Sequence, residues 1–194
     1  QAVQRRRSYY DITAASPIPD AAIQDIVKTA LTYCPSAFNA QSARAVLLLG
    51  KEHLALWQIV KDTLRKIVPA DRFGRTEQKL ATFAAGYGSI LFFEDQQKHR
   101  SLQEKYPSYS DNVAPWSLQA SGMLQFIVWT ALEEAGFGAS LQHYNPLIDA
   151  AVRQRWNLPE HWLLLSQMPF GVPASQPGDK QIDPLDHRFK AFPA

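Results

Sequence analysis

Two basic side chains and a hydroxyl occupy consecutive positions near the start of the chain. Arg6 and Arg7 provide guanidinium groups, which bind phosphate oxygens bidentately, and Ser8 adds a further hydrogen-bond donor. This combination suits a phosphate monoester. The same spacing also fits a solvated basic arm, so a phosphate site is one of two hypotheses for these residues.

A second polar cluster occupies residues 35–42, Pro-Ser-Ala-Phe-Asn-Ala-Gln-Ser. Ser36, Asn39, Gln41 and Ser42 place two hydroxyls and two amides between a predicted helix and a predicted strand. Amides and backbone N–H groups suit the polar edge of a flavin, which offers carbonyl oxygens, ring nitrogens and an N–H. A capped surface loop is the alternative interpretation.

Residues 136–144, Gly-Phe-Gly-Ala-Ser-Leu-Gln-His-Tyr, form a third candidate. The two glycines follow a predicted helix and precede a predicted strand, which is the reverse of the order in a dinucleotide-binding fingerprint. They therefore indicate a helix cap and a tight turn. Histidine is a common general acid near neutral pH, but no acidic residue accompanies His143 in the sequence, so a packing role is favoured. No serine has a nucleophile-elbow context, and hydrolase chemistry has no support.

Composition narrows the class of protein. The 194 residues carry a net charge of +2 and are 46% hydrophobic, which predicts one globular domain spanning residues 1–194 with no nucleic-acid-binding face. The apolar stretches are interrupted too often for a membrane span, and we expect a cytoplasmic protein. The one cysteine, Cys34, excludes an internal disulfide and is expected to be a buried small hydrophobe. We expect no metal site, because no clustered His/Cys spacing is present.

Hydrophobic periodicity predicts helices alternating with four strands, the pattern of an α+β or α/β domain. The predicted helices lie at about 20–34, 51–68, 77–85, 95–105, 116–135 and 145–156, and the predicted strands at 45–49, 89–93, 139–144 and 162–168. The last helix is expected to turn Leu147, Ile148 and Trp156 inward.

The predicted helix at 116–135 is apolar on most sides, with Leu118, Met123, Phe126, Ile127 and Trp129 spread around its axis. Such a helix must be buried on several faces. In a domain of this size the pattern indicates a central helix that runs through a subunit interface.

The order of these segments resembles the nitroreductase family, and in particular the short subfamily similar to fungal fatty-acid-repression-mutant proteins and their bacterial counterparts. The resemblance covers nearly the whole chain. Its segments are Arg-Arg-Ser at 6–8, the polar cluster at 35–42, Gly-Tyr-Gly-Ser-Ile-Leu-Phe-Phe-Glu-Asp at 86–95, Ser-Gly-Met-Leu-Gln-Phe at 121–126, Gly-Ala-Ser-Leu-Gln-His-Tyr-Asn-Pro at 138–146, Met-Pro-Phe-Gly at 168–171 and Arg-Phe-Lys at 188–190.

The resemblance implies an α+β fold with a mixed, largely antiparallel sheet flanked by helices, and a homodimer whose long central helix lies at the interface. It also implies one FMN at each end of that interface. The FMN-binding residues implied by match are Arg6, Arg7, Ser8 and Tyr10 at the start, Ser36, Phe38, Asn39 and Gln41 reaching the flavin from the partner subunit, Ser140, Leu141 and Gln142 beside the ring with a backbone N–H facing N5, and Arg188 and Lys190 near the phosphate.

This sequence departs from the family pattern at one position. Many larger members have a basic residue two places after the serine, where this chain has Tyr10. A positive charge there would stabilise the reduced flavin anion. Tyr10 can still donate a hydrogen bond, and Arg44 is a candidate replacement for the missing charge.

The implied activity is an FMN-dependent NAD(P)H oxidoreductase that reduces nitroaromatics, quinones or similar small-molecule acceptors. NADH or NADPH would give hydride to flavin N5 and leave before the acceptor enters, which is a ping-pong scheme. No catalytic side chain is required, because the flavin carries the chemistry. Two alternatives stay open: a flavin-binding regulatory or sensing protein with incidental reductase activity, and a dimeric scaffold without flavin.

Overall fold

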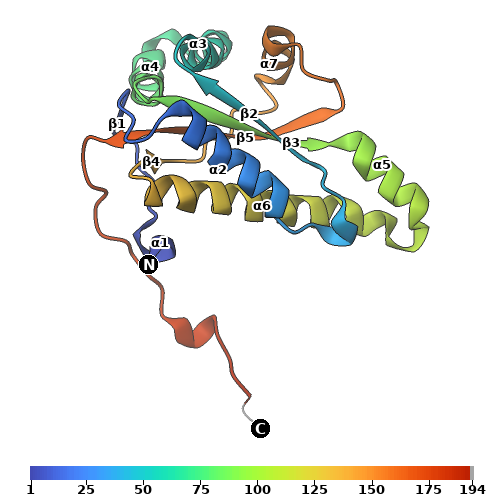
Figure 1. Ribbon diagram of the computed structural model, residues 1–194. Helices are drawn as coiled ribbons and strands as arrows, with labels where there is room; N and C mark the ends of the chain where they lie inside the picture. Colours follow the sequence, from blue (N-terminus) through green and yellow to red (C-terminus); the bar gives the residue numbers. More distant parts are fainter. Residues whose placement is uncertain (193–194) are drawn as a thin grey trace.

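The computed structural model describes residues 1–192 and contains a five-stranded sheet between two layers of helices (Figure 1). The strand order is β1 (Ile12–Thr13), β5 (Trp162–Pro173), β3 (Gly88–Asp95), β2 (Ala43–Leu49), and β4 (Gly138–Ala139) also pairs with β5. All of these strand pairs are antiparallel, and a single parallel bridge joins Ser8 to Ala139. The predicted α+β class with a largely antiparallel sheet is confirmed.

The helices cover both faces of the sheet. They are α1 (Ala2–Arg5), α2 (Asp20–Tyr33), α3 (Lys51–Arg65), α4 (Ala70–Ala84), α5 (Gln96–Lys105), α6 (Ser110–Glu134) and α7 (Asp149–Trp156), with short 3-10 turns η1 (Ala37–Asn39), η2 (Pro107–Tyr109) and η3 (Leu185–His187). Helices α2 and α6 lie on one face of the sheet, and α3, α4 and α7 lie on the other (Figure 1).

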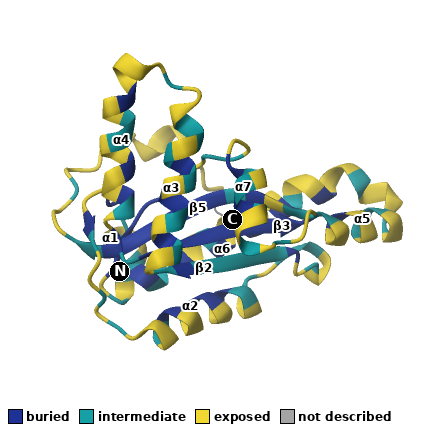
Figure 2. Cartoon of the chain, turned by 90° about the horizontal axis from the view of Figure 1, so that it is seen from above, coloured by how far each residue is buried: buried dark blue, intermediate teal, exposed yellow. Residues whose placement is uncertain are grey.

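Alternate residues of β3 divide the core into two clusters. All eight β3 residues are buried, as expected for a central strand covered on both faces. Ile90 and Phe92 pack with α2 and α6, while Leu91 and Phe93 pack with α3, α4 and α7. In the view coloured by burial, this strand is dark blue and the outer faces of the helices are exposed (Figure 2). The sheet is therefore a rigid frame for the segments at its two ends.

Helix α6 begins six residues before the predicted start. The six added residues include Pro115, which lies in the second turn of the helix and costs one backbone hydrogen bond. Leu124 and Val128 pack in the core with Ile90 and Phe92 of the sheet, whereas Leu118 and Phe126 are exposed in the single chain. At the far end, Gly136 takes φ +91° while Phe137 N donates to Leu132 O and Gly136 N to Glu133 O, the predicted glycine cap.

Three sequence predictions need correction. The predicted strand 139–144 pairs only at Gly138–Ala139 and at the isolated bridge of Gln142 with Gln167. Leu147 is 53% exposed, because α7 begins two residues after it and Leu147 lies in the preceding turn. Helix α4 starts at Ala70 rather than near 77, since Gly74 is tolerated inside it.

After β5 the chain leaves the sheet and runs past α1 as an extended tail (Figure 1). The apolar side chains of Ile182, Leu185, Phe189 and Phe192 on this tail are 61–90% exposed. Within the described part of the chain, no helix combines the length and the apolar character needed to cross a bilayer.

Candidate functional site

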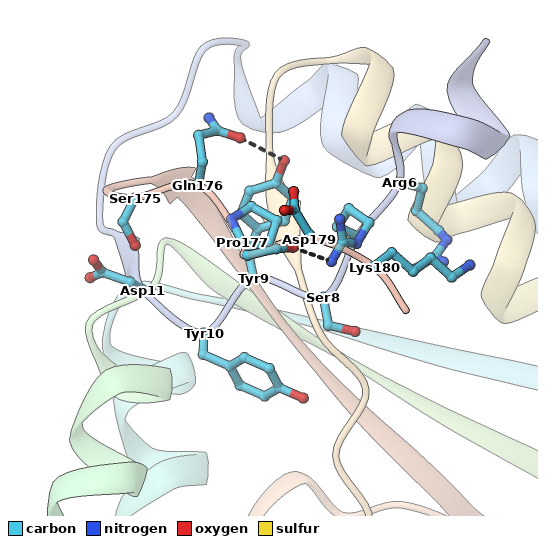
Figure 3. Close-up of a pocket in the computed structure, with 12 residues that line it drawn as sticks. Arg6, Ser8, Tyr9, Tyr10, Asp11, Ser175, Gln176, Pro177, Asp179 and Lys180 are labelled. Atoms are coloured by element: carbon cyan, nitrogen blue, oxygen red, sulfur yellow. Dashed lines mark hydrogen bonds between the residues drawn. The ribbon is translucent and has the colours of Figure 1, made fainter. Parts of the chain in front are cut away.

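The basic triplet lines a cavity of about 530 Å³ at one end of the sheet (Figure 3). Arg6, Arg7 and Ser8 form one wall, and the start of the tail, Ser175 to Lys180, forms the other. Tyr9, Tyr10 and Asp11 complete the lining. The predicted phosphate-binding residues therefore lie together in one concave site rather than on a free arm.

Backbone pairing joins this triplet to the 138–142 segment. Ser8 bridges Ala139, and Tyr9 N donates to Ala139 O at 3.0 Å. The close contact between these two segments requires glycine at position 138. A Cβ atom there would lie 2.6 Å from the Tyr9 side chain and 2.9 Å from the Pro173 side chain. Two segments that are about 130 residues apart in sequence are thereby held side by side.

The segment 140–142 follows Ala139, the backbone partner of Ser8 and Tyr9, and leaves one backbone donor free on its side away from β5. Ser140 N donates to Pro169 O at 3.3 Å and Gln142 N to Gln167 O at 2.7 Å, both on β5. Alternate residues of an extended segment point their N–H groups in opposite directions. Leu141 N–H, between them, therefore points away from β5, and among the described residues it has no backbone acceptor. It is available to a ligand.

The charges around the cavity favour an anion. Arg7 Nη2 donates to Gly178 O at 2.7 Å, which closes the tail over the triplet. The lining contains three cations, Arg6, Arg7 and Lys180, against two carboxylates, Asp11 and Asp179. An excess of cations near a backbone donor is the electrostatic pattern of a phosphate site.

Arg188 and Lys190 do not join this cavity within one chain. Both are exposed on the tail, and Arg188 Nη2 donates only to Asp183 O at 3.3 Å. Lys180 lines the cavity instead, and sequence reasoning missed it. It stands eight residues before Arg188, the first residue of the matched Arg-Phe-Lys motif, in a tail whose Pro- and Asp-rich composition carried no positional signal.

The second predicted cluster forms a strained loop before β2. Phe38, Asn39 and Gln41 all have positive φ, between +47° and +53°, a backbone region that residues other than glycine rarely adopt. Ser36 Oγ accepts from Gln41 N at 3.1 Å and closes the loop. Such strain concentrates at sites that need a fixed backbone.

Aromatic rings fix the exposed side of this loop. Phe38 stacks on Tyr106 with ring centroids 4.4 Å apart, and Tyr109 and Trp116 lie within 6 Å of it. Beside the loop, a cavity of about 300 Å³ is lined by Cys34, Ser36, Gln41, Arg44 and Trp162, among others. Cys34 is only partly buried there, so the prediction of a buried hydrophobe is wrong: its Sγ contacts Ala120 O at 3.5 Å.

The two predicted halves of the site lie at opposite ends of the sheet. Arg44 of β2 lies opposite Phe93 of β3, which in turn lies opposite Leu164 of β5. Ser8 lies opposite Ala139 of β4, which in turn lies opposite Phe170 of β5. The offset of six residues from Leu164 to Phe170 corresponds to about 20 Å of strand. Within one chain, the cations and the Leu141 N–H are therefore separated by about this distance from the strained polar loop.

Arg44 is already paired. It binds Asp95 at 2.7 Å and donates to the backbone oxygens of Gln41 and Ala43. Burial opposes the charge of Asp95, but backbone N–H groups of Gln97 and Lys98, together with Arg44, outweigh it and lower the pKa of that carboxyl. Arg44 thus shapes the loop, and it is not a free cation replacing the residue absent at Tyr10.

Two of the five histidines, His143 and His53, differ in burial. His143 is exposed. His53 is buried, and its ring joins Ser89 Oγ at 2.9 Å and Ala84 O at 3.2 Å, while Trp57 Nε1 also donates to Ser89 Oγ. Burial lowers the pKa of His53 to about 4, so it is a neutral structural group. Among residues 1–192, no three His, Cys, Asp or Glu side chains are grouped to hold a metal ion.

Comparison with known proteins identifies the kind of molecule that carries this arrangement. The family model "Nitroreductase family" matches residues 3–172. Two proteins of Saccharomyces cerevisiae are similar: HBN1, 34% identical over 90% of this chain and 88% of its own length, and nitroreductase FRM2, 32% identical over 92% and 90%.

Solved structures agree with this comparison. Nitroreductase CinD from Lactococcus lactis superposes with a TM-score of 0.89 in its complex with chloramphenicol, at 39% identity over 98% of this chain and 97% of CinD. Its complex with 4-nitrophenol gives a TM-score of 0.88 at 40% identity and the same coverage. The predicted likeness to fungal fatty-acid-repression-mutant proteins is confirmed by FRM2, and this chain is a member of the nitroreductase family of oxidoreductases.

Proposed function

We propose that this protein is an FMN-dependent NAD(P)H oxidoreductase that acts as a homodimer and reduces nitroaromatics, quinones or similar small acceptors. The observation that carries the proposal is the junction of the Arg6–Ser8 triplet with the 138–142 segment. It joins a cation-rich cavity to an unpaired backbone N–H. A flavin mononucleotide requires both features, a phosphate site and donors at the ring.

The residues fit FMN better than a dinucleotide. Arg6, Arg7, Ser8 and Lys180 would hold the phosphate, and Leu141 N–H would donate to the ring edge beside Ser140 and Gln142. Among residues 1–192, no glycine-rich turn opens a helix near the cavity to bind a second phosphate. Arg188 and Lys190 stay a prediction: they can contribute only if the tail is placed differently in the assembled protein.

A second copy would complete the site. The loop containing Ser36, Phe38, Asn39 and Gln41 lies about 20 Å along the sheet from Ser8, too far to share a ligand ring with it in one chain. A twofold axis beside α6 would bring the loop of one subunit to the cation cavity of the other. The exposed apolar side chains of α6 support this interface.

When bound, FMN supplies two-electron transfer from the nicotinamide to the acceptor. The protein's part is to hold the phosphate, orient the ring through backbone and amide donors, and leave one ring face open to both substrates in turn. Chloramphenicol and 4-nitrophenol, both bound in CinD structures, support an open site that accepts nitroaromatic molecules. The reduced nicotinamide donor and the single cysteine also support a cytoplasmic location.

The proposal is tested by identifying the cofactor and measuring turnover. Heat-released cofactor from the purified protein should chromatograph as FMN, and steady oxidation of NADH or NADPH with 4-nitrophenol should give the parallel double-reciprocal lines of a ping-pong scheme. A majority of FAD would contradict the phosphate-site assignment. Bound FMN without steady turnover would favour a regulatory flavoprotein instead.

A further inference from the structure

A second group of polar atoms lies behind the cation cavity, where α6 meets α1. The guanidinium carbon of Arg6 lies 4.4 Å from the centroid of the Trp129 ring, over its face. Trp129 and Glu133 are four residues apart on α6, so they lie on the same face of that helix. The proposed phosphate function of Arg6 makes this packing relevant to the site.

Three of these side chains have buried atoms with no partner. Arg6 Nε, Trp129 Nε1 and Glu133 Oε2 are shielded from solvent, and none has a hydrogen-bond partner among the described residues. Buried polar groups are nearly always paired, so three such atoms on adjacent side chains are unusual. Arg6 is held by the face of Trp129 rather than by a protein carboxylate, and its charge stays available to an anion.

Glu133 is the carboxylate that faces these arginines. Burial raises the pKa of Glu133, while Arg5 at the end of α1 and Arg6 directly after it lower that pKa. Burial, and to a smaller extent the charge of Glu133, raise the pKa of the Tyr9 phenol. No ion pair joins Glu133 to either arginine within residues 1–192, and Glu134, next to it on α6, is exposed and points elsewhere.

Glu133 does not line the cavity, but it interacts electrostatically with Arg6, which does. A phosphate bound at Arg6 therefore adds nearly two negative charges to the surroundings of this carboxylate. Like charges in a partly buried site disfavour each other, so the carboxylate is more stable with a proton when the phosphate is present. The proton would come from solvent and stay on Glu133 until the anion leaves. Binding of the anion and protonation of Glu133 are then linked equilibria.

We propose that Trp129 and Glu133 are positioning residues of the phosphate site: Trp129 holds the Arg6 guanidinium by its ring face, and Glu133 takes up a proton when a phosphate monoester binds. This rests on the proposed function only in its choice of FMN as the ligand. Neither residue is required to touch the flavin.

The proton uptake can be counted by titrating apoprotein with FMN calorimetrically, in buffers of different ionisation enthalpy, between pH 5.5 and 8. The parent should take up more protons per FMN than Glu133→Gln, by up to one per site, and Glu134→Gln should match the parent. The second ionisation of the FMN phosphate, near pH 6, contributes equally to all three proteins. Riboflavin, which has no phosphate, should show no difference between them.

Trp129 is tested by affinity. Trp129→Ala should weaken FMN binding about 10-fold with riboflavin binding unchanged, and Trp129→Phe, which keeps a ring face, should restore affinity to within about threefold of the parent.

Equal proton counts for the parent and Glu133→Gln would overturn the role of Glu133. If Glu133→Gln does not fold, the parent alone decides. Binding the dianion releases the phosphate's own proton, so this release, calculated from the second ionisation of free FMN, is first subtracted from the measured count. Uptake that remains with FMN and is absent with riboflavin supports the proposal, and no remaining uptake at any pH between 5.5 and 8 overturns it. A parent that does not bind FMN at all would contradict the proposed function, which is a different outcome.

Discussion

At the scale of single residues, the triplet Arg6-Arg7-Ser8 shows both the strength and the limit of sequence reasoning. Spacing left a phosphate site and a solvated arm open, the family resemblance implied the phosphate site, and the structure places the triplet in a cation-rich cavity. The sequence could not indicate which cation of the tail lies beside the triplet within one chain, because a tail without regular structure gives no periodic signal. Lys180, rather than Arg188, lies beside the triplet.

The cation assignment leads to a first prediction. Arg7→Ala and Lys180→Ala should each weaken FMN binding by about 10- to 100-fold, because a charge-assisted hydrogen bond contributes roughly 1.5–3 kcal/mol. Riboflavin should bind all variants alike. Fluorescence titration of apoprotein with both flavins measures this, with Lys51→Ala at the exposed start of α3 as the control. Unchanged FMN affinity in both variants would show that this cavity does not bind the FMN phosphate.

A second prediction concerns His53, whose pKa falls from 6.5 to about 4 on folding. The unfolded chain binds the proton more tightly, so this stability is complete above pH 6.5 and is lost as the pH falls from 6.5 toward 4. Urea unfolding of the FMN-saturated protein should lose about 2–3 kcal/mol from this group between pH 7 and pH 4.5. His53→Gln should remove that part of the pH dependence, and His143→Gln should keep it. Identical slopes in His53→Gln and the parent would mean that His53 is not the responsible group.

At the scale of elements, the loop before β2 combines function with backbone strain. Gln41 holds φ +47°, a conformation that costs roughly 1–2 kcal/mol outside glycine and asparagine. Gln41→Gly should therefore stabilise the apoprotein by roughly 0.5–1 kcal/mol, after the extra backbone entropy of glycine is subtracted. Asn39→Gly should gain less, because asparagine tolerates this region. The urea midpoint of each variant decides, and a destabilised Gln41→Gly would show that the loop is not strained.

The elements with strong periodicity were predictable, and those that depend on tertiary contacts were not. The sequence predicted β2 and β3 from their apolar runs and α2 from its apolar stripe. These patterns are visible in the sequence because burial on one or two faces dictates the residue types. The 139–144 segment was misread as a full strand. Its residues have strand composition, but β4 ends at Ala139, and only Gln142 pairs again. No local pattern records where a neighbouring strand stops pairing.

At the scale of the whole molecule, α6 explains why the chain is expected to pair. Its outer face exposes Leu118, Met123, Phe126 and Ile127, each 36–56% accessible in the single chain. The prediction from sequence that this helix is apolar all round is consistent with that exposure, and the dimer itself stays a proposal. Apolar surface on this scale indicates an interface.

A fourth prediction compares the effects of two matched substitutions on the dimer and on FMN binding. Leu118→Glu should dissociate the dimer and lose FMN together, because each site needs a loop from the other subunit. Leu54→Glu, an equally exposed leucine on α3 in the opposite layer, should change neither property. Light scattering at micromolar protein concentration measures the mass of the assembly, and absorbance detection in the same experiment measures the bound FMN. A monomeric parent that still holds FMN would contradict the shared site.

The central claim is that this chain binds FMN and passes electrons to it from a reduced nicotinamide. The most direct measurement is the visible spectrum of the FMN-loaded protein under anaerobic conditions, before and after NADH or NADPH, and again after 4-nitrophenol. We predict that the flavin band bleaches with at least one nicotinamide and returns with the acceptor. A band that neither nicotinamide changes, or that stays bleached with every nitroaromatic and quinone offered, would contradict the account.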